Sequence, residues 1–426
     1  MADSYLAFLR DRRVDAIDLR PVFARAGAGN FWLQDEHMNL RAQELIAAEL
    51  HPLVVAARPP GATRARRAPV SAGANPGDLL SPGSASTPVA EAATAESTQA
   101  MLELVSFEEP DAARLFVERP HTVFDPLAGY RYASDLELPS QELGLGERFS
   151  FVTNSQGLRN DEELAAADLR IVITGDEQVA GACPNPTTFA GLLEAALRRQ
   201  RPGERIEALN AGVVGYSFFN YLGVLARSLE LDPDVFVLTV SSGSDFLEGL
   251  RINCLLAGRK FWRSADGARE AFQAARQVSR PALEQGFESL HYFREHRPQG
   301  QRAYKVALDA TLAVRDLCAE HGIELVVLHL PSAIDVEWKR HAAVFEQLGE
   351  TLGIEQRYMN TNLRLVAPYL QELQRIGVAV IDLEETLAGS EQPLYGADDF
   401  LITPAAHALI AERLLERLDE LGLAGR

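Results

Sequence analysis

The sequence has 426 residues, of which 47% are hydrophobic and 24% charged, as in an ordinary globular protein. Its formal net charge of −19 argues against nucleic-acid binding, because phosphates would repel it. No apolar run approaches about 18 residues, so no membrane-spanning helix is predicted. The first residues lack the apolar core of a signal peptide, and the three cysteines lack metal or disulfide spacing. We therefore expect a cytoplasmic protein without metal or cofactor.

The chain is predicted to begin with a small α/β fragment over residues 1–57. It comprises a helix at Tyr5–Arg13, a strand at Val14–Leu19 and a helix at Leu40–Val54. One strand and two helices bury too little apolar area to fold alone. Residues 58–99 are rich in Ala, Pro, Ser and Gly, which predicts a disordered linker. An aromatic-rich lead-in over 100–168 then precedes a domain over 169–426.

Apolar strands and amphipathic helices alternate after residue 168. The expected strands are Arg170–Thr174, Ile206–Asn210, Val235–Val240, Ile323–Leu330 and Val378–Leu383. The expected helices are Thr188–Arg199, Phe219–Leu229, Arg302–Glu320, Asn360–Ile376 and Thr403–Leu421. This alternation predicts a parallel sheet with helices on both faces. The first strand runs into Gly175-Asp176-Glu177, at the sheet edge where ligands and catalytic groups collect.

The chain contains an internal repeat. Residues 5–50 align without a gap with residues 369–414, with 14 identities in 46 positions. Both copies have the order helix, strand, loop with an acidic residue, and final helix. We interpret residues 1–57 as the tail of a second domain of the same kind.

From Phe124 onward the chain resembles the SGNH (GDSL-type) hydrolases. The stretch Asn154-Ser-Gln-Gly-Leu-Arg159 looks like the Asn-Ser-x-Gly-x-Arg lead-in of that family. The Gly-Asp-Ser block falls on residues 175–177, the second block on residues 210–216, and Gly-Gly-Asn-Asp on residues 242–245. The resemblance implies a three-layer α/β/α, flavodoxin-like fold with a five-stranded parallel sheet in the order 2-1-3-4-5. Its site would lie where the first and third strands diverge.

The catalytic positions of that family are replaced in this chain. The resemblance assigns Glu177 to the serine nucleophile, Ser244 to the asparagine donor and Leu401 to the histidine base, while Asp399 remains. A carboxylate cannot become an alkoxide, and leucine cannot accept a proton. Losing the nucleophile or base of such a unit costs on the order of 10⁶ in turnover. The glycine whose N–H would hold the oxyanion is Gly212 or Gly215.

Two other residues of the domain and one motif outside it are candidate substitutes. We expect His407 to be an exposed helix residue rather than a replacement base, and Ser217 to be a helix cap. The N-terminal fragment keeps the Asp-x-His motif as Asp35 and His37. Those two residues indicate either a truncated tandem domain or a fragment that serves an SGNH half-domain encoded upstream.

Three functions are compatible with these observations. The first, which we favour, is a pseudo-hydrolase that keeps a binding role for a small acyl or glycan ligand. The second is an active acyl-ester (O-acetyl) hydrolase with a non-standard nucleophile. The third is a hard-cation site built from Asp176, Glu177 and Asp245, because such cations prefer oxygen ligands. In the first two, Asp176 and Asp245 would help to bind the substrate.

Overall fold

The computed structural model describes residues 107, 121–143, 149–259, 261 and 268–423. The chain divides into two units, 1–81 and 82–426, and the described residues belong to the second. The N-terminal fragment with Asp35 and His37, and the predicted linker, lie outside the described residues. Within the described part of the chain, no helix is both long and apolar enough to cross a membrane.

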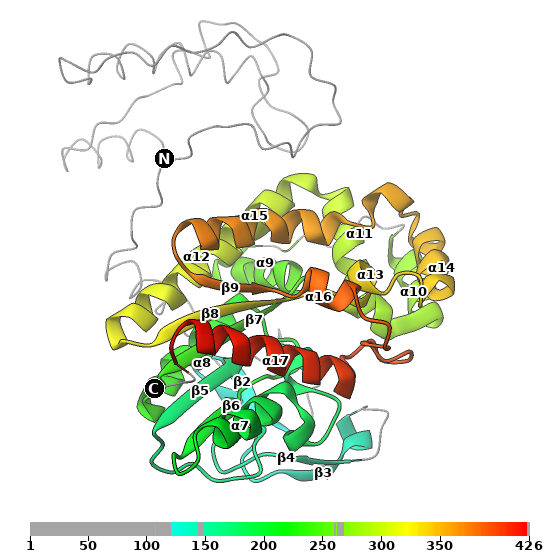
Figure 1. Ribbon diagram of the computed structural model, residues 1–426. Coiled ribbons are helices and arrows are strands. Elements are labelled where there is room, and N and C mark those ends of the chain that lie inside the picture. The colour runs from blue at the N-terminus through cyan, green and yellow to red at the C-terminus, as the bar shows by residue number, and fades with distance from the viewer. Residues whose placement is uncertain (1–106, 108–120, 144–148, 260, 262–267, 424–426) are drawn as a thin grey trace, which may run out of the picture. The chain divides into compact units, whose positions relative to one another are not determined.

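A five-stranded parallel sheet forms the centre of the domain (Figure 1). Its strands are β5 (Leu169–Thr174), β6 (Ile206–Asn210), β7 (Val235–Ser241), β8 (Glu324–Leu330) and β9 (Ala379–Asp382). They lie in the order β6-β5-β7-β8-β9, which is the predicted 2-1-3-4-5. The five predicted strands are thus confirmed. Their nearly continuous apolar runs are what a parallel sheet buried on both faces requires.

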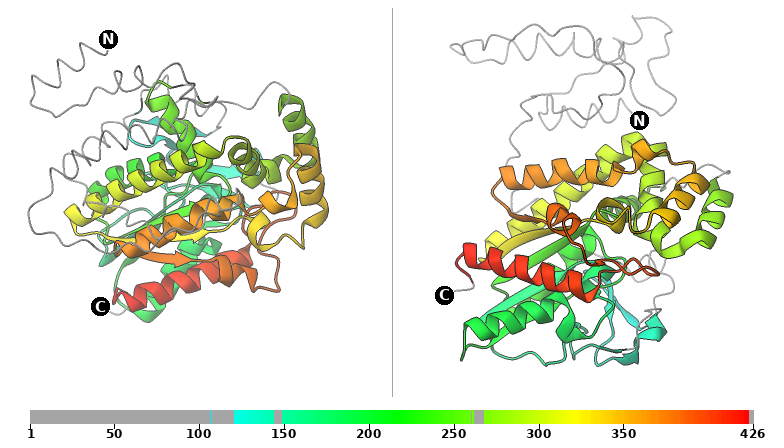
Figure 2. Two further views of the ribbon diagram at one scale, coloured as in Figure 1. Left: turned by 90° about the horizontal axis from the view of Figure 1, so that it is seen from above. Right: turned by 45° about the vertical axis from the view of Figure 1, so that its right-hand side comes forward.

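Helices cover both faces of the sheet and make three layers (Figures 1 and 2). One face carries α7 (Phe189–Gln200) and α17 (Pro404–Glu420), while α14 (Ala342–Leu352) packs against the insertion described below. The other carries α8 (Phe218–Ser228), α9 (Asp245–Leu256), α12 (Arg297–His321) and α15 (Thr361–Arg375). Strand β7 shows why two cores form, because successive side chains point to opposite faces. Val235 and Val237 enter one core, whereas Phe236 and Leu238 enter the other.

The lead-in is folded onto the domain as two antiparallel hairpins. The first pairs β1 (Thr122–Asp125) with β2 (Gly129–Tyr132), and the second pairs β3 (Glu137–Pro139) with β4 (Ser150–Val152). The single helical turn η1 (Ser140–Leu143) follows β3. The buried rings of Tyr132 and Phe151 meet edge to face, with centroids 4.9 Å apart. Both belong to the same core as α8, so the described part of the lead-in packs into the domain.

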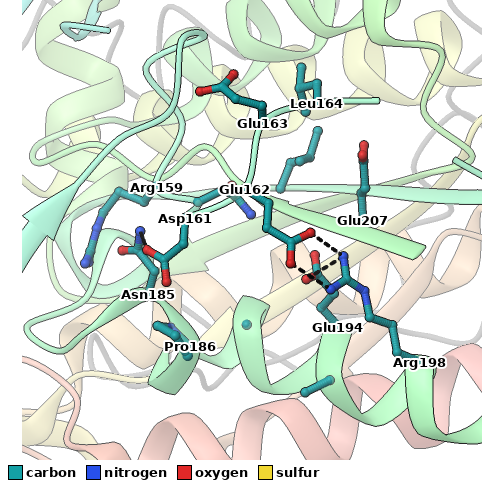
Figure 3. Close-up of a pocket in the computed structure, with 14 residues that line it drawn as sticks. Arg159, Asp161, Glu162, Glu163, Leu164, Asn185, Pro186, Glu194, Arg198 and Glu207 are labelled. Carbon is teal, nitrogen blue, oxygen red and sulfur yellow. Dashed lines mark hydrogen bonds and ion pairs between the residues drawn. The ribbon is translucent and has the colours of Figure 1, made fainter. Parts of the chain in front are cut away.

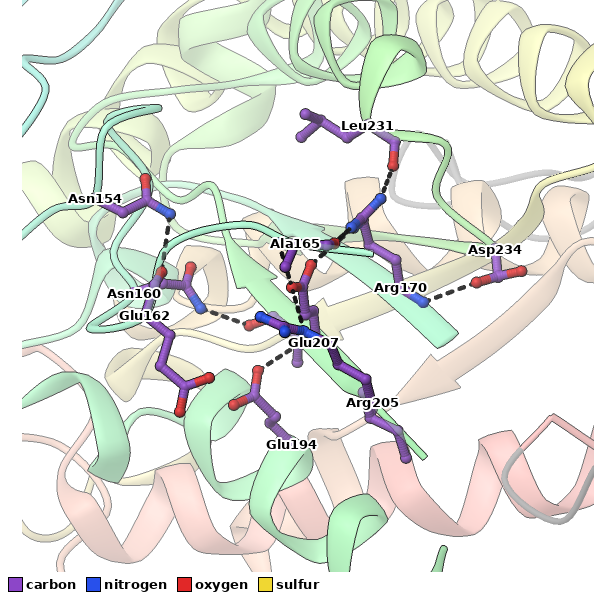
Figure 4. A network of polar contacts seen from close by, with 12 residues as sticks. Asn154, Asn160, Glu162, Ala165, Arg170, Glu194, Arg205, Glu207, Leu231 and Asp234 are labelled. Carbon is purple, nitrogen blue, oxygen red and sulfur yellow. Dashed lines mark hydrogen bonds and ion pairs between the residues drawn. The ribbon is translucent and has the colours of Figure 1, made fainter. Parts of the chain in front are cut away.

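The lead-in also covers the free edge of strand β6. The backbone N–H of Arg159 donates to the carbonyl of Asn210 at 2.9 Å. The Asn160 amide (Figure 4) donates to the carbonyl of Ala208 at 2.9 Å and accepts from the N–H of Asn210 at 3.0 Å. Arg170, which begins the predicted first strand, ion-pairs with Glu207 at 2.9 Å in the same region (Figure 4). Side chains therefore stand where another strand would pair.

An insertion separates α9 from α12. It contains α10 (Ala268–Ala282), a π-helical turn η4 (Leu283–Phe287) and α11 (Glu288–Glu295). The remaining short elements are α6 (Glu177–Ala180), η2 (Asn185–Thr187), η3 (Leu229–Leu231), α13 (Ala333–Val336), η5 (Gln356–Tyr358) and α16 (Glu384–Ala388). The insertion supplies a contact to the candidate site, through Gln285, that the sequence did not predict.

Candidate functional site

The turn from β5 into α6 forms the centre of the candidate site. Asp176 caps the short helix α6 by accepting a hydrogen bond from the N–H of Gln178 at 2.9 Å. Gly175 is required by packing, since a Cβ there would lie 2.1 Å from Cγ2 of Val179 and 3.1 Å from Cβ of Thr239. The turn is thus pressed against β7. The close packing of Gly175 and the cap by Asp176 fix the direction of the Glu177 side chain, which follows them at the start of α6.

The Glu177 carboxylate is bonded to groups that lie far away in the sequence. Its Oε2 accepts a hydrogen bond from the backbone N–H of Gly215 at 2.8 Å. Its Oε1 accepts another from the side-chain amide of Gln285, in the insertion. The N–H of Gly212 donates instead to Oδ1 of Asn210 at 3.0 Å. Both backbone N–H groups considered for an oxyanion therefore already have acceptors within the chain, and that of Gly215 is held by a carboxylate.

The third block lies beside this turn but does not meet Glu177 directly. The Ser244 hydroxyl donates to Oδ2 of Asp176 at 3.4 Å. Asp245 points into the core, where its Oδ2 accepts from the N–H of Ser241 at 2.8 Å and from the hydroxyl of Tyr221 at 2.9 Å. Asp245 is 0% exposed, so it supports the start of α9. The residue suggested by the sequence as a ligand contact is therefore buried in the core.

Burial dominates the electrostatics of the two aspartates. It raises the pKa of Asp176 well above its ordinary value, and the neighbouring Glu177 charge adds to the rise. Burial likewise raises the pKa of Asp245 well above its ordinary value, with the Asp176 charge as the second cause. Both carboxyls are thus biased toward their neutral forms, which are poor ligands for a cation. Among the residues that the structure describes, no group of three His, Cys, Asp or Glu side chains could hold a metal ion.

The last block forms the other wall of the site. Oδ1 of Asp399 accepts a hydrogen bond from the N–H of Leu401 at 3.0 Å, so this acid orders its own loop. Leu401 is 7% exposed and offers only apolar atoms where the resemblance places a histidine. Gln178 connects this loop to α6 by accepting from the N–H of Ile402 at 2.9 Å. The sheet edge thus carries Glu177, Ser244 and Leu401, and the last of these offers no imidazole to act as a base.

The prediction that His407 is exposed is wrong. His407 is 0% exposed between α17 and α7, and its Nδ1 accepts a hydrogen bond from the N–H of Phe189 at 3.1 Å. Burial, with a smaller contribution from the charge of Arg159, lowers its pKa to about 3. The histidine therefore caps the start of α7 in its neutral form. Ser217 occupies the N-cap of α8, as predicted, and its N–H donates to the Asn220 side chain at 2.9 Å.

Arg159 is a buried residue that sequence reasoning left without a role. Its guanidinium is 1% exposed and donates to the carbonyls of Ala180, Gly181 and Cys183, at 2.8 Å for Gly181 and 2.9 Å for Cys183. It also lies 4.2 Å from the ring centroid of Phe151. Arg159 thus anchors the segment after α6. The Asn-Ser-x-Gly-x-Arg motif was the signal that could have identified it.

A pocket of about 280 Å³ lies away from this site, between the 159–164 loop, α7 and β6 (Figure 3). Its carboxylates are already paired. Arg198 bonds both oxygens of Glu162, at 3.0 and 3.2 Å, and also contacts Glu194 at 3.1 Å. Glu194 accepts a second hydrogen bond from the N–H of Ala208 at 2.8 Å. These contacts explain the pocket as a satisfied structural network.

Comparisons with known proteins give structural relatives only. No family model and no curated protein matches the sequence. The chain is similar to an alpha/beta hydrolase enzyme from the metagenome of Lake Arreo, Spain, with 15% identity, a TM-score of 0.36, and coverage of 62% of this chain and 99% of that chain. It is similar to the psychrotrophic esterase EstA from Pseudoalteromonas sp., with 12% identity, a TM-score of 0.35, and coverage of 60% and 98%.

A third similar structure is the lipase/acylhydrolase from Enterococcus faecalis, with 14% identity, a TM-score of 0.33, and coverage of 59% of this chain and 96% of that chain. Within this chain, the sheet order is the one the resemblance implied. The three blocks stand at the ends of β5, β6 and β7. The protein therefore has the three-layer α/β/α fold and the sheet order that the resemblance implied.

Proposed function

We propose that this protein is a non-hydrolytic SGNH-fold protein that retains a binding role. The observation that carries the proposal is the hydrogen bond from the N–H of Gly215 to Oε2 of Glu177, at 2.8 Å. In an ester hydrolase, such a donor must be available to the oxygen that gains charge in the transition state. Here a carboxylate of the chain takes the donor, and a substrate oxygen would have to displace it.

The proton chemistry of the site supports the same proposal. A hydroxyl nucleophile needs a base within hydrogen-bonding reach. Leu401 supplies none, and Nδ1 of His407 is engaged with the N–H of Phe189. The Ser244 hydroxyl instead faces Asp176, whose raised pKa favours the protonated form, which does not accept a proton.

The proposed ligand remains a small acyl or glycan molecule, and an SGNH half-domain encoded upstream is the alternative partner. Support for an acyl group comes from Val214, a large apolar side chain that is 41% exposed. Its neighbour Gly215 contacts Glu177, so this side chain stands beside the site. Binding of short-chain fatty acids can be measured by ligand-observed NMR, and Val214→Asp is expected to weaken it. Unchanged binding would remove Val214 from the ligand surface.

The absence of hydrolysis can be tested with two reagents. We expect no turnover of p-nitrophenyl acetate above the uncatalysed rate and no covalent labelling by a fluorophosphonate. An active serine esterase under the same conditions provides the positive control. Labelling of a serine at the carboxyl edge of the sheet, located by peptide mass spectrometry, would overturn the proposal.

One observation favours the alternative of ester hydrolysis by a non-standard nucleophile. The Ser242 hydroxyl donates to Oδ2 of Asp335 at 2.6 Å, which makes a serine–carboxylate pair. Ser242 is only 1% exposed, and Asp335 also accepts from the Ser332 hydroxyl at 2.7 Å. If hydrolysis were detected, Ser242→Ala should abolish it under this alternative. The pair is otherwise explained as the cap of α13.

A further inference from the structure

We propose that Gln178 and Gln285 form an amide latch that holds the insertion and the 399–402 loop together across the degenerate site. Gln285 belongs to the π-helical turn η4, and π-helical turns are frequent at functional positions. Its side chain contacts both Glu177 and Gln178. Gln178 in turn contacts the backbone of the last block. The latch thus joins three segments that are distant in the sequence.

The direction of every hydrogen bond in the latch is fixed by backbone groups at its far end. The N–H of Ile402 can only donate, so the Gln178 atom 2.9 Å away is its oxygen. The carbonyl of Phe400 can only accept, so it receives the Gln178 amide N–H at 3.1 Å. The same amide group donates to Oε1 of Gln285 at 2.9 Å. The NH₂ group of Gln285 therefore faces Glu177.

Glutamine is the side chain that this arrangement needs at both positions. Each latch residue acts as donor and acceptor at once, so neither glutamate nor an apolar residue can reproduce the pattern. The carboxylate of Glu177 closes the chain of bonds by accepting from Gln285 and from the N–H of Gly215. The N–H of Gly215 is thereby connected, through Glu177 and the two glutamines, to the 399–402 loop.

Backbone packing holds the insertion in place above the site. A Cβ on Gly243, in the third block, would lie 2.2 Å from the carbonyl oxygen of Gln285. A Cβ on Gly286 would lie 2.5 Å from Cδ1 of Ile334. The η4 turn is thus in direct backbone contact with the third block and fits closely against α13. Releasing Gln285 is expected to loosen the cover over half-buried Ser244.

The latch can be tested by measuring access to the site with a thiol. In the full chain, Ser244→Cys places a thiol next to Gly243, which the carbonyl of Gln285 closely approaches, and all three native cysteines are buried. Adding Gln285→Ala should raise the rate of labelling by Ellman's reagent about tenfold, because two hydrogen bonds that hold the cover are lost. Glu284→Ala is the matched control, since Glu284 is exposed on the same turn and pairs with Arg280. Equal labelling rates in Ser244→Cys alone, with Gln285→Ala and with Glu284→Ala would overturn the latch.

A second readout follows the far end of the latch. Hydrogen exchange of the 399–402 loop should speed up by a similar factor in Gln285→Ala, although residue 285 does not contact the N–H of Ile402. Exchange in α7 should not change, which shows that the variant is folded. If exchange becomes faster throughout the protein, or if it does not become faster in the 399–402 loop, the coupling between Gln285 and that loop is contradicted. Fluorophosphonate labelling would overturn the proposed function and leave these results standing.

Discussion

The contact between Glu177 and Gly215 can be probed by removing the carboxylate and offering another one. Glu177→Ala deprives the N–H of Gly215 and the amide of Gln285 of their acceptor. Hydrogen bonds to charged groups contribute about 1.5–3 kcal/mol when buried, and Glu177 is half-buried. We therefore expect the free energy of unfolding to fall by about 2 kcal/mol. Glu177→Gln keeps an acceptor and should cost about 1 kcal/mol.

Removing the charge also relieves repulsion with Asp176, but this opposing effect should be small. The pKa of Asp176 is raised by burial first and by Glu177 second, so the aspartate is biased toward its neutral form before the substitution. A neutral neighbour is not repelled by the carboxylate. Loss of the two hydrogen bonds should therefore decide the sign of the change.

Urea unfolding at several acetate concentrations provides the assay. Acetate can occupy the vacated donors in Glu177→Ala. For a dissociation constant of about 10 mM, 100 mM acetate would restore about 1.4 kcal/mol. Chloride at the same ionic strength should restore nothing, and acetate should leave the wild type and Glu177→Gln unchanged. The reasoning is refuted if Glu177→Ala is as stable as the wild type, or if acetate stabilises all three proteins equally.

Three further predictions concern buried polar groups. The pKa of Asp245 is raised in the folded state, so the folded chain holds this proton more tightly and stability falls as pH rises above about 4. Asp245→Asn should flatten that fall in urea titrations at pH 4–8. The pKa of His407, about 3, lies below its ordinary value of 6.5, so stability falls as pH drops below 6.5. His407→Asn should remove up to about 1.4 kcal/mol per pH unit of that slope, and an unchanged acid limb would contradict this assignment. Arg159→Lys should cost about 2–4 kcal/mol, because an ammonium cannot reproduce the fork that bonds the carbonyls after α6. Arg198→Lys, on a more exposed ion pair, should cost about 0–1 kcal/mol, and equal costs would contradict burial as the cause.

The sheet could be predicted from the sequence because its signals are local. Five short apolar runs separated by helical patterns define a parallel sheet, and the blocks at the strand ends place its edge. The strand order came from the resemblance, since periodicity alone does not order parallel strands. Five helices were likewise expected close to where they lie, as with α7 and α17. Helices α9, α10, α11 and α14 were not predicted.

The contacts that define the site could not be predicted in the same way. Gln285 bonds to Glu177 across 108 positions of sequence, from an insertion without a recognisable motif. His407 seemed exposed because a single histidine in a helix gives no sign of which neighbour it meets. The stacking of its ring on Phe189, with centroids 5.7 Å apart, depends on how two helices pack. The acceptor of the Gly215 N–H could not be predicted either, because it is a side chain from another strand end.

The covered edge of β6 has a consequence for the solubility of the protein. An exposed edge strand offers a row of unpaired backbone groups to which another chain can add, and such edges promote aggregation. Asn160 blocks this addition by bonding the edge carbonyl of Ala208 and the edge N–H of Asn210. The lead-in therefore occupies the edge of β6 with the Asn160 side chain and the Arg159 backbone, so that no further strand can pair there. A shortened protein beginning at residue 169 would expose a self-complementary edge and should associate with copies of itself.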